Sequence, residues 1–369
     1  MSRMMINGRA LARIGLLVSL VGLILIWAYP RRHDLQDTLS YSTRPLWDTT
    51  GKAEAPNHII PHLQADGVAA DDAAACARHG WVTREHDVKL VDAFLISTEV
   101  ELLEARLREL EDVVDKFVIV ESDYTLMGQP KNMTFQQNWP RWSKWSSKIV
   151  YQAYKGRAMN AGDGPFTLVN EMRLGVSNLL RGMSLSAADL VLMSDIDEIP
   201  SRSALQLLKA CQAPSPIHLQ LRPYTYSFEW EAGEASWRAS LHQWGASGNF
   251  YGHGKRSDVM LADAGWHCSW CFATLEEFVQ KMKGASHADR LYHRLHWQQY
   301  LSHERIQSKI CKGEDLFDML PETYSWSELI EHWRGSTRTP SAVGLPRAVI
   351  QDAEKFKFLL PGGCKRQAR

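Results

Sequence analysis

The chain lacks a surplus of charge of either sign. Its 369 residues include 42 Lys and Arg and 42 Asp and Glu, so the formal net charge is zero. Broad binding of nucleic acid requires many unpaired basic side chains on one face, and this balance argues against a nucleic-acid partner. Hydrophobic residues make up 45% and charged residues 23%, which excludes a disordered chain. The length allows two domains, or one large α/β domain with appendages.

Cysteines are also few, and several well-known motifs are missing. Six cysteines are too few for a scaffold held together mainly by disulfides. The sequence contains no Walker phosphate loop, no G-x-S-x-G nucleophile elbow and no zinc ribbon of paired cysteines. It has no internal repeat and no low-complexity tract. Tryptophan, in contrast, is unusually frequent, with 14 residues.

One long apolar run is present, at the N-terminus. Residues 14–30 carry no charge and reach the lower end of the length, about 17–25 residues, that spans a bilayer as a helix. The rival interpretation is a cleaved signal peptide, but Trp27, Tyr29 and Pro30 crowd the place of its small-residue cleavage site. Aromatic residues there suit a membrane interface. We therefore expect an uncleaved signal anchor, with residues 1–13 in the cytosol and the rest of the chain in the lumen.

Residues 31–87 show no sustained periodicity and are interrupted by Pro45, Pro56 and Pro61. This composition predicts a stem between the membrane and a folded domain. The alternative is that part of it packs on that domain, with Trp81 as the first candidate. We place the folded domain at residues 88–362 and a C-terminal tail at 363–369.

Strand and helix patterns alternate from residue 88 onward. Strands are predicted at 88–96, 116–121, 148–154 and 189–194, and helices at 99–110, 167–183 and 201–211. This alternation predicts an α/β fold with a mostly parallel sheet and helices on both faces. Ligands of such sheets bind at the carboxyl ends of the strands, where Glu121 and Asp195 fall.

The second half of the chain has a different pattern. From residue 217 to about 270 the sequence is aromatic, irregular and strand-like. Residues 274–284 predict a helix that begins with a capping box between Thr274 and Glu277. Residues 290–312 predict a longer helix.

An acidic cluster, Ser194-Asp-Ile-Asp-Glu198, directly follows an apolar strand. Carboxylates at i and i+2 of an extended chain project to the same side, so Asp195 and Asp197 could together hold one divalent ion. Oxygen ligands suit Mg²⁺ or Mn²⁺, which are typically shared with a substrate diphosphate. The alternative is a solvated turn, since acidic residues gather in loops for their polarity alone.

A second cluster spans residues 264–271 and contains Trp266, His267, Cys268, Trp270 and Cys271. A structural zinc site would need a second ligand pair, which the sequence does not offer. In an oxidising lumen either cysteine is expected in a disulfide, with the other or with another cysteine of the chain. The two tryptophans could stack on a sugar ring or fill a core.

Two single positions are also informative. Arg173 could pair with a phosphate, although a salt bridge is the commoner use of such a residue. Asn132 begins an Asn-Met-Thr sequon, which predicts N-glycosylation if this part of the chain is luminal.

Several of these stretches together resemble glycosyltransferase family 17. The similar stretches are residues 92–106 and 117–122 for the start of the family's domain, 195–200 for its metal motif, 264–272 for its most distinctive segment and 346–360 for its close. The resemblance extends from about residue 88 to residue 360, nearly the whole expected luminal domain. It is therefore more specific than any one motif.

This resemblance implies a GT-A-like fold, a UDP-GlcNAc donor, a divalent cation that is usually Mn²⁺, and a mannose of an N-linked glycan as acceptor in the Golgi. It carries the metal role onto Asp195 and Asp197, with His267 as an alternative third ligand. It makes Glu121 and Arg173 parts of a donor pocket. Some members of the family have another acid directly before the D-x-D motif, where this chain has Ser194.

The implied reaction is an inverting displacement, in which a general base takes a proton from the acceptor hydroxyl. Asp263 is the first candidate for that base, followed by Glu229 and Glu198. Trp266 and Trp270 become candidate platforms for the acceptor sugar. The alternatives are an inactive membrane-anchored glycan-binding protein, a transferase with another nucleotide sugar or acceptor, and a glycoside hydrolase. A hydrolase needs two carboxylates flanking one bond, and the sequence offers no clear second member.

Overall fold

The computed structural model describes residues 8–32, 55–65, 67–164, 166–233, 235–246, 250–285, 288–292, 296–318 and 335–368. Several predictions fall partly outside these ranges: the cytosolic tail at residues 1–7, the stem at 33–54 and 66, the helix of residues 290–312 at 293–295, the C-terminal tail at 369, and the folded domain at the gaps within 88–362.

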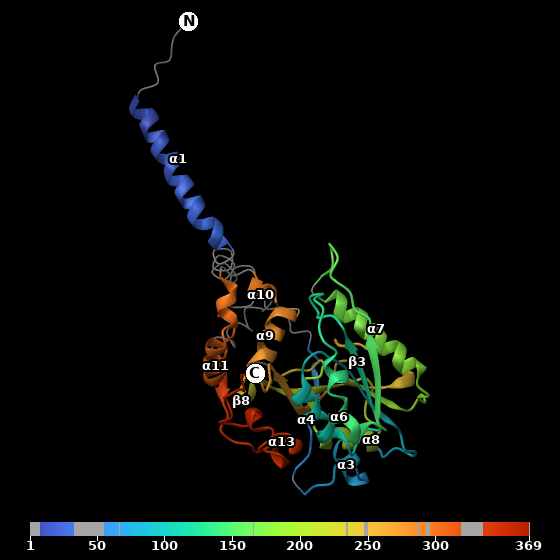
Figure 1. Ribbon diagram of the computed structural model, residues 1–369. Helices are drawn as coiled ribbons and strands as arrows, with labels where there is room; N and C mark the ends of the chain where they lie inside the picture. The colour runs from blue at the N-terminus through green and yellow to red at the C-terminus, as the bar shows by residue number, and fades with distance from the viewer. Residues whose placement is uncertain are drawn as a thin grey trace.

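The predicted apolar span is a helix. α1 (Gly8–Ala28) continues into a short 3₁₀ turn, η1 (Tyr29–Arg31). Residues 13–31 are long and apolar enough to cross a membrane, and none of them is buried against the rest of the described structure (Figure 1). The helix begins earlier than residue 14, and the guanidinium of Arg31 lies 4.9 Å from the ring centre of Trp27 at its end. A candidate membrane span at the predicted place is thereby confirmed.

The remaining described chain is built around one large sheet, with the strand order β1-β10-β7-β9-β5-β2-β3-β4. The strands of this path are β1 (His58–Ile60), β2 (Leu90–Ile96), β3 (Lys116–Ser122), β4 (Ile149–Tyr154), β5 (Leu190–Met193), β7 (Ile217–Thr225), β9 (Ser240–Gln243) and β10 (Val259–Ser269). Among these strands only β9 runs antiparallel to its neighbours. Off the path lie β6 (Glu198–Pro200), β8 (Ser227–Glu231) and β11 (Thr337–Arg338). The predicted α/β fold with a mostly parallel sheet is confirmed.

Helices cover both faces of this sheet. α4 (Val100–Leu110) and α8 (Arg202–Ala210) share one core cluster with Leu90 and Phe94 of β2. α7 (Thr167–Gly182) shares another cluster with Val91 and Ala93 of the same strand. Successive residues of a strand point to opposite faces, so β2 is buried on both sides. This burial explains why its sequence is an almost uninterrupted apolar run.

Shorter helices complete the architecture. They are α3 (Ala73–Arg78), α5 (Thr134–Gln137), α6 (Trp139–Trp142) and α13 (Arg347–Gln351), with 3₁₀ turns η2 (Ser143–Trp145), η3 (Trp244–Ala246) and η5 (Lys357–Leu359). α9 (Leu275–Gly284) begins with the predicted capping box, in which the Thr274 hydroxyl accepts from the Glu277 amide and the Glu277 carboxylate accepts from the Thr274 amide.

The predicted helix over residues 290–312 is wrong. The structure has α10 (Asp289–Tyr292), η4 (Trp297–Leu301) and α11 (His303–Lys312) in its place. His296 adopts a left-handed backbone with φ of 59°, and Ser302 is extended and caps α11 by accepting from the Arg305 amide. Both conformations interrupt a helix. The apolar pattern of residues 290–312 therefore belongs to three short segments and not to one helix.

Both predicted domain boundaries lie inside the folded part. β1, from the expected stem, pairs in parallel with β10, and Cys76 of α3 forms a disulfide with Cys211 at the end of α8. At the other end, Cys364 is bonded to Cys311 of α11, and Arg366 is buried. The alternative that part of the stem packs on the domain therefore holds, and the expected C-terminal tail packs on it as well.

Candidate active site

The acidic cluster follows β5 at the carboxyl end of the parallel strands, and it is a tight turn. The amide of Glu198 donates to the carbonyl oxygen of Asp195 at 3.0 Å, which closes the turn. Glu198 then begins β6, which pairs antiparallel with β10. The expected extended geometry for Asp195 and Asp197 is thus wrong, although the two carboxylates remain in one turn at a strand end. We call residues 194–198 the acidic turn.

Arg106 of α4 binds the acidic turn through several hydrogen bonds. Its guanidinium makes a two-pronged ion pair with Asp92 of β2 at 2.9 and 2.7 Å, and both side chains are fully buried. The same group donates to the Ser194 hydroxyl at 2.6 Å and to the carbonyl oxygens of Asp195 and Glu198 at 2.9 and 2.6 Å. A buried ion pair is favourable only when its remaining donors are also paired, and these contacts meet that condition.

Neither residue of this pair was predicted, although both leave a signal in the sequence. Arg106 lies on the apolar face of its helix, between Leu103 and Leu107, and Asp92 interrupts an apolar strand. A charged residue on a buried stripe has to find a partner of opposite charge. The position of Ser194, noted as a departure from the family pattern, is filled by a hydroxyl that accepts from Arg106.

Asp195 faces two basic side chains. Its carboxylate lies 3.3 Å from Arg173 of α7 and 3.7 Å from the imidazole of His253, and 40% of the side chain is exposed. The Nε of Arg173 is buried and has no hydrogen-bond partner among the described residues. The structure therefore brings the predicted donor-pocket residue Arg173 to the predicted metal ligand Asp195.

Asp197 is enclosed by the second half of the chain. Its carboxylate lies 3.8 Å from His267 of β10 and 3.5 Å from Lys281 of α9, with 15% of the side chain exposed. Its carbonyl oxygen accepts from the amide of Cys268 at 2.9 Å, and Cys268 is bonded to Cys271. The end of β10 is thereby fixed against the acidic turn.

Glu198 is fixed by hydrogen bonds within the same cluster of charged side chains. Its carboxylate accepts from the Ser236 hydroxyl at 2.7 Å and the Asp195 amide at 3.0 Å, and it lies 2.8 Å from His253. Burial opposes ionisation, yet the adjacent His253 lowers the pKa of Glu198 well below its usual range. Burial lowers the pKa of His253, but Glu198 and Asp195 outweigh it and raise that pKa above the ordinary value. A carboxylate held in this way is poorly placed to accept a further proton.

The other two candidates for the general base are also ion-paired. Glu229 is buried and binds Arg338 at 2.6 Å and the amide of Gly362 at 2.9 Å, so it fastens the C-terminal segment. Asp263 lies at an irregularity of β10 with φ of 45° and binds Arg222 at 2.6 Å. Arg222 lowers the pKa of Asp263, whose side chain is 57% exposed.

Glu121 lies at the carboxyl end of β3 and is buried. Its carboxylate accepts from the Phe135 amide at 2.9 Å and the Tyr151 hydroxyl at 3.0 Å, and pairs with Lys131 at 3.3 Å. Burial, with Glu121 as a further cause, raises the pKa of Tyr151. Asn132, the predicted glycosylation site, is exposed beside this network.

The two candidate sugar platforms are packed against other side chains. Trp266 is buried in a cluster with Ile199 and Phe228, and its indole N–H donates to the Gly344 carbonyl oxygen at 2.9 Å. The ring of Trp270 stacks on that of Phe278, with 6.3 Å between the ring centres. The core interpretation therefore describes Trp266, and the structure shows no open ring face on it.

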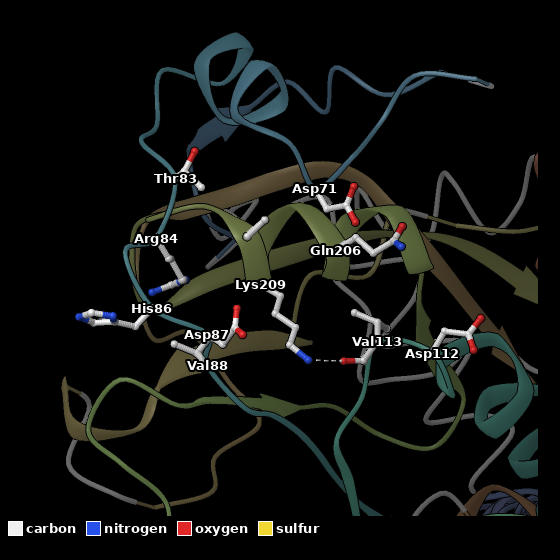
Figure 2. Close-up of a pocket in the computed structure, with 11 residues that line it drawn as sticks. Asp71, Thr83, Arg84, His86, Asp87, Val88, Asp112, Val113, Gln206 and Lys209 are labelled. Carbon is white, nitrogen blue, oxygen red and sulfur yellow. Dashed lines mark hydrogen bonds between the residues drawn. The ribbon is translucent and has the colours of Figure 1, made fainter.

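A separate cavity of about 320 Å³ lies at the opposite end of the strands, beside their amino ends. It is lined by residues that precede β2 and β3 and by α8, among them Arg84, Asp87, Val113 and Lys209. Figure 2 shows Lys209 reaching across it to the carbonyl oxygen of Val113, at 3.0 Å. Because the acidic turn follows the carboxyl end of β5, this cavity is not part of the site.

The acidic turn could bind a metal ion that takes only a few of its ligands from the protein. In the described part of the chain no group of three or more His, Cys, Asp and Glu side chains is arranged to hold a metal ion. Mg²⁺, however, is commonly held by one or two carboxylates together with substrate phosphates, rather than by a protein cage. Asp195 and Asp197 fit that kind of site, with His267 beside them.

Comparison with known proteins gives a consistent result. The model of glycosyltransferase family 17 matches residues 9–367. The β-1,4-mannosyl-glycoprotein 4-β-N-acetylglucosaminyltransferases of Rattus norvegicus and Mus musculus are each 26% identical to the chain over 318 residues, which is 76% of this chain and 56% of theirs. The enzyme of that name from Homo sapiens is 27% identical over 244 residues, 56% of this chain and 45% of its own length.

The chain thus spans little more than half the length of these relatives. The family match, in contrast, extends over almost the whole chain and includes all the residues of the acidic turn. The chain belongs to glycosyltransferase family 17.

Proposed function

We propose that the protein transfers N-acetylglucosamine from UDP-GlcNAc to a mannose of N-linked glycans. The observation that carries this proposal is the acidic turn itself, with Asp195 and Asp197 at a strand end and the cations Arg173 and Lys281 beside them. The names of the relatives supply the sugar and the acceptor. A site with both carboxylates and cations suits a nucleotide diphosphate, whereas a purely glycan-binding protein has no need of them.

The proposal extends to the fold and the compartment. We assign the domain to the GT-A type and the protein to the Golgi membrane, as a single-pass type II protein with its folded part in the lumen. In support, a candidate span precedes the folded part, and all six cysteines are paired in three disulfides. Disulfides persist in secretory compartments and are rare in the cytosol.

The proposed chemistry is an inverting displacement at the anomeric carbon of the donor. Asp195 and Asp197 would hold Mn²⁺, which supplies positive charge to the departing diphosphate. Arg173 adds a cation beside Asp195, at 3.3 Å, and its guanidinium could pair with the diphosphate of the nucleotide sugar. We keep Asp263 as the proposed base because it is the exposed one of the three candidates, and it would exchange Arg222 for the acceptor hydroxyl.

A donor and acceptor screen tests this function. The full-length protein in detergent is incubated with Mn²⁺ and UDP-GlcNAc, UDP-GalNAc, UDP-glucose or GDP-mannose, and release of the nucleotide diphosphate is followed with and without N-glycans. Release from UDP-GlcNAc that requires a mannose-terminated N-glycan is the expected result. Release from a different donor would replace the proposed sugar, and no release with any donor would favour an inactive glycan-binding protein.

A further inference from the structure

A lysine from the second half of the chain reaches the acidic turn. Lys281 lies in the last part of α9, a helix fixed at its start by the capping box and along its length by buried Phe278 and Met282. The backbone that carries this lysine is therefore held firmly, and the direction of its side chain follows from the packing of the helix.

The ammonium group of Lys281 is enclosed by two carboxylates and two aromatic rings. It lies 3.5 Å from Asp197 and 3.7 Å from Glu99, with 5.5 and 5.3 Å to the ring centres of Trp270 and Phe272. The side chain is 21% exposed, so the site is neither sealed nor fully solvated.

Neither carboxylate makes a close hydrogen bond with this ammonium. Both separations exceed the N–H···O distances of about 2.7–3.2 Å that are typical of proteins. Glu99 already accepts from the backbone amides of Ser97 and Thr98 at 3.0 and 2.8 Å. An ammonium group has three donors, so Lys281 can take up a further anionic acceptor without giving up a strong bond.

A second cation lies beside the acidic turn. Asp195 has a cation at 3.3 Å, Arg173, and Asp197 has one at 3.5 Å, Lys281, each from a different helix. The two cations thus lie beside two of the three carboxylates of the acidic turn, those of Asp195 and Asp197. An anion that binds beside the turn meets a positive group whether it approaches Asp195 or Asp197.

We propose that Lys281 is a donor-binding residue, whose ammonium donates to a phosphate oxygen of the nucleotide-sugar diphosphate beside Asp197. This inference rests on the proposed function, because it requires a donor with a diphosphate. Lysine binds phosphate as a point charge, and such charge-assisted hydrogen bonds are stronger than neutral ones. The contact gains strength as charge develops on the leaving diphosphate, so it serves the reaction as well as binding.

Binding of nucleotide fragments tests the proposal without turnover. The affinities of the full-length protein in detergent for UDP, UMP and uridine are measured by calorimetry at one Mn²⁺ concentration. We expect Lys281→Gln to weaken binding of UDP by about 10–100-fold and to change binding of uridine by less than about twofold. Lys281→Arg keeps the charge and should retain most of the UDP affinity.

Lys283→Gln is the matched control, because it removes the same charge from the same helix two residues further on. It should bind UDP as the wild type does. If Lys281→Gln does not fold, judged by its thermal unfolding, Lys281→Met carries the same comparison, since Met can pack against Trp270 and Phe272.

The possible failures are distinguishable. Equal UDP affinity of the wild type and Lys281→Gln would overturn the inference and leave the proposed function standing. Equal weakening for UDP and uridine would also overturn it, because the lysine would then support only the shape of the site. No binding of any of the three compounds to the wild type would overturn the proposed donor class together with this inference.

Discussion

Arg106 and Asp92 form the most completely buried ion pair of the described site, and the acidic turn depends on them. The guanidinium also holds Ser194 and two carbonyl oxygens of the turn, so a substitution there changes both charge balance and shape. A substitution that breaks the hydrogen bonds of a buried ion pair leaves the charge of the remaining partner poorly compensated in a medium of low dielectric constant. The residue thus links the stability of the domain to the position of Asp195.

We predict that Arg106→Lys lowers the free energy of unfolding by about 2–4 kcal/mol, because Lys cannot reproduce the two-pronged pair. The measurement is urea unfolding of the full-length protein in detergent. Arg108→Lys is the control, since Arg108 lies on the same helix with 33% of its side chain exposed, and its buried partner Glu104 is also paired with Arg141 and Lys355. The control should change stability by less than about 1 kcal/mol. Equal effects of the two substitutions would contradict the structural role of Arg106.

Glu277 gives a prediction for pH. Burial, together with the nearby carboxylates of Glu101 and Glu99, raises the pKa of Glu277 to about 7. The folded state therefore prefers the neutral acid, and the resulting stability is full below about pH 4.5 and declines as the pH rises to about 7. Glu277→Gln keeps a side chain suited to the capping box and removes this decline.

We expect Glu277→Gln to match the wild type in stability at pH 4 and to exceed it by about 1–3 kcal/mol at pH 8. Thermal unfolding at the two pH values measures the difference. Glu276→Gln, on the exposed neighbour, serves as the control and should show no such pH dependence. A variant less stable than the wild type at pH 8 would show that the charged carboxylate of Glu277 stabilises the fold.

At the scale of elements, the disulfide between Cys76 and Cys211 joins the stem segment to α8 across 135 residues of sequence. A cross-link over so long a loop restricts the unfolded chain strongly. We predict that the double variant Cys76→Ser and Cys211→Ser loses about 2–5 kcal/mol of unfolding free energy in urea. An unchanged midpoint would show that β1 and α3 do not contribute to the cooperative unit.

Strands buried on both faces were among the elements that the sequence made predictable. β2, β3 and β5 are apolar runs because both of their faces are covered. α9 was predictable for a different reason, since the capping box marks its first turn in the sequence. β1 has three residues and depends on its partner β10, so no local pattern marks it. The predicted long helix failed because its breaks are set by backbone conformations at His296 and Ser302.

The same limit applies to the site. Asp195 and Asp197 were predictable because they follow an apolar strand, and the end of a parallel strand is where such sheets bind ligands. His253 and Lys281 approach them from distant segments of the chain, and only the folded sheet brings these together. Asp263 and Glu229 were selected by residue type, and their partners Arg222 and Arg338 could not be read from the sequence.

At the scale of the whole molecule, the net charge is zero, but charged side chains of both signs are concentrated around the acidic turn. A candidate membrane span precedes a single large sheet in the described chain, and the charged groups of the site gather where the acidic turn, which follows β5, contacts the end of β10. Carboxylates and cations alternate there, so local pairs replace the broad basic surface that the composition excludes. This arrangement is compatible with the small anionic donor that we propose.

The most direct test of the account is turnover by variants of the acidic turn. Release of UDP from UDP-GlcNAc is measured with Mn²⁺ and an N-glycan acceptor for the wild type, Asp195→Asn, Asp197→Asn and the control Asp258→Asn, whose side chain is 59% exposed. We predict a loss of about 100-fold or more for each variant of the turn, with thermal unfolding nearly unchanged, and full activity for the control. Undiminished UDP release by Asp195→Asn and Asp197→Asn would contradict the assignment of the acidic turn as the centre of the reaction.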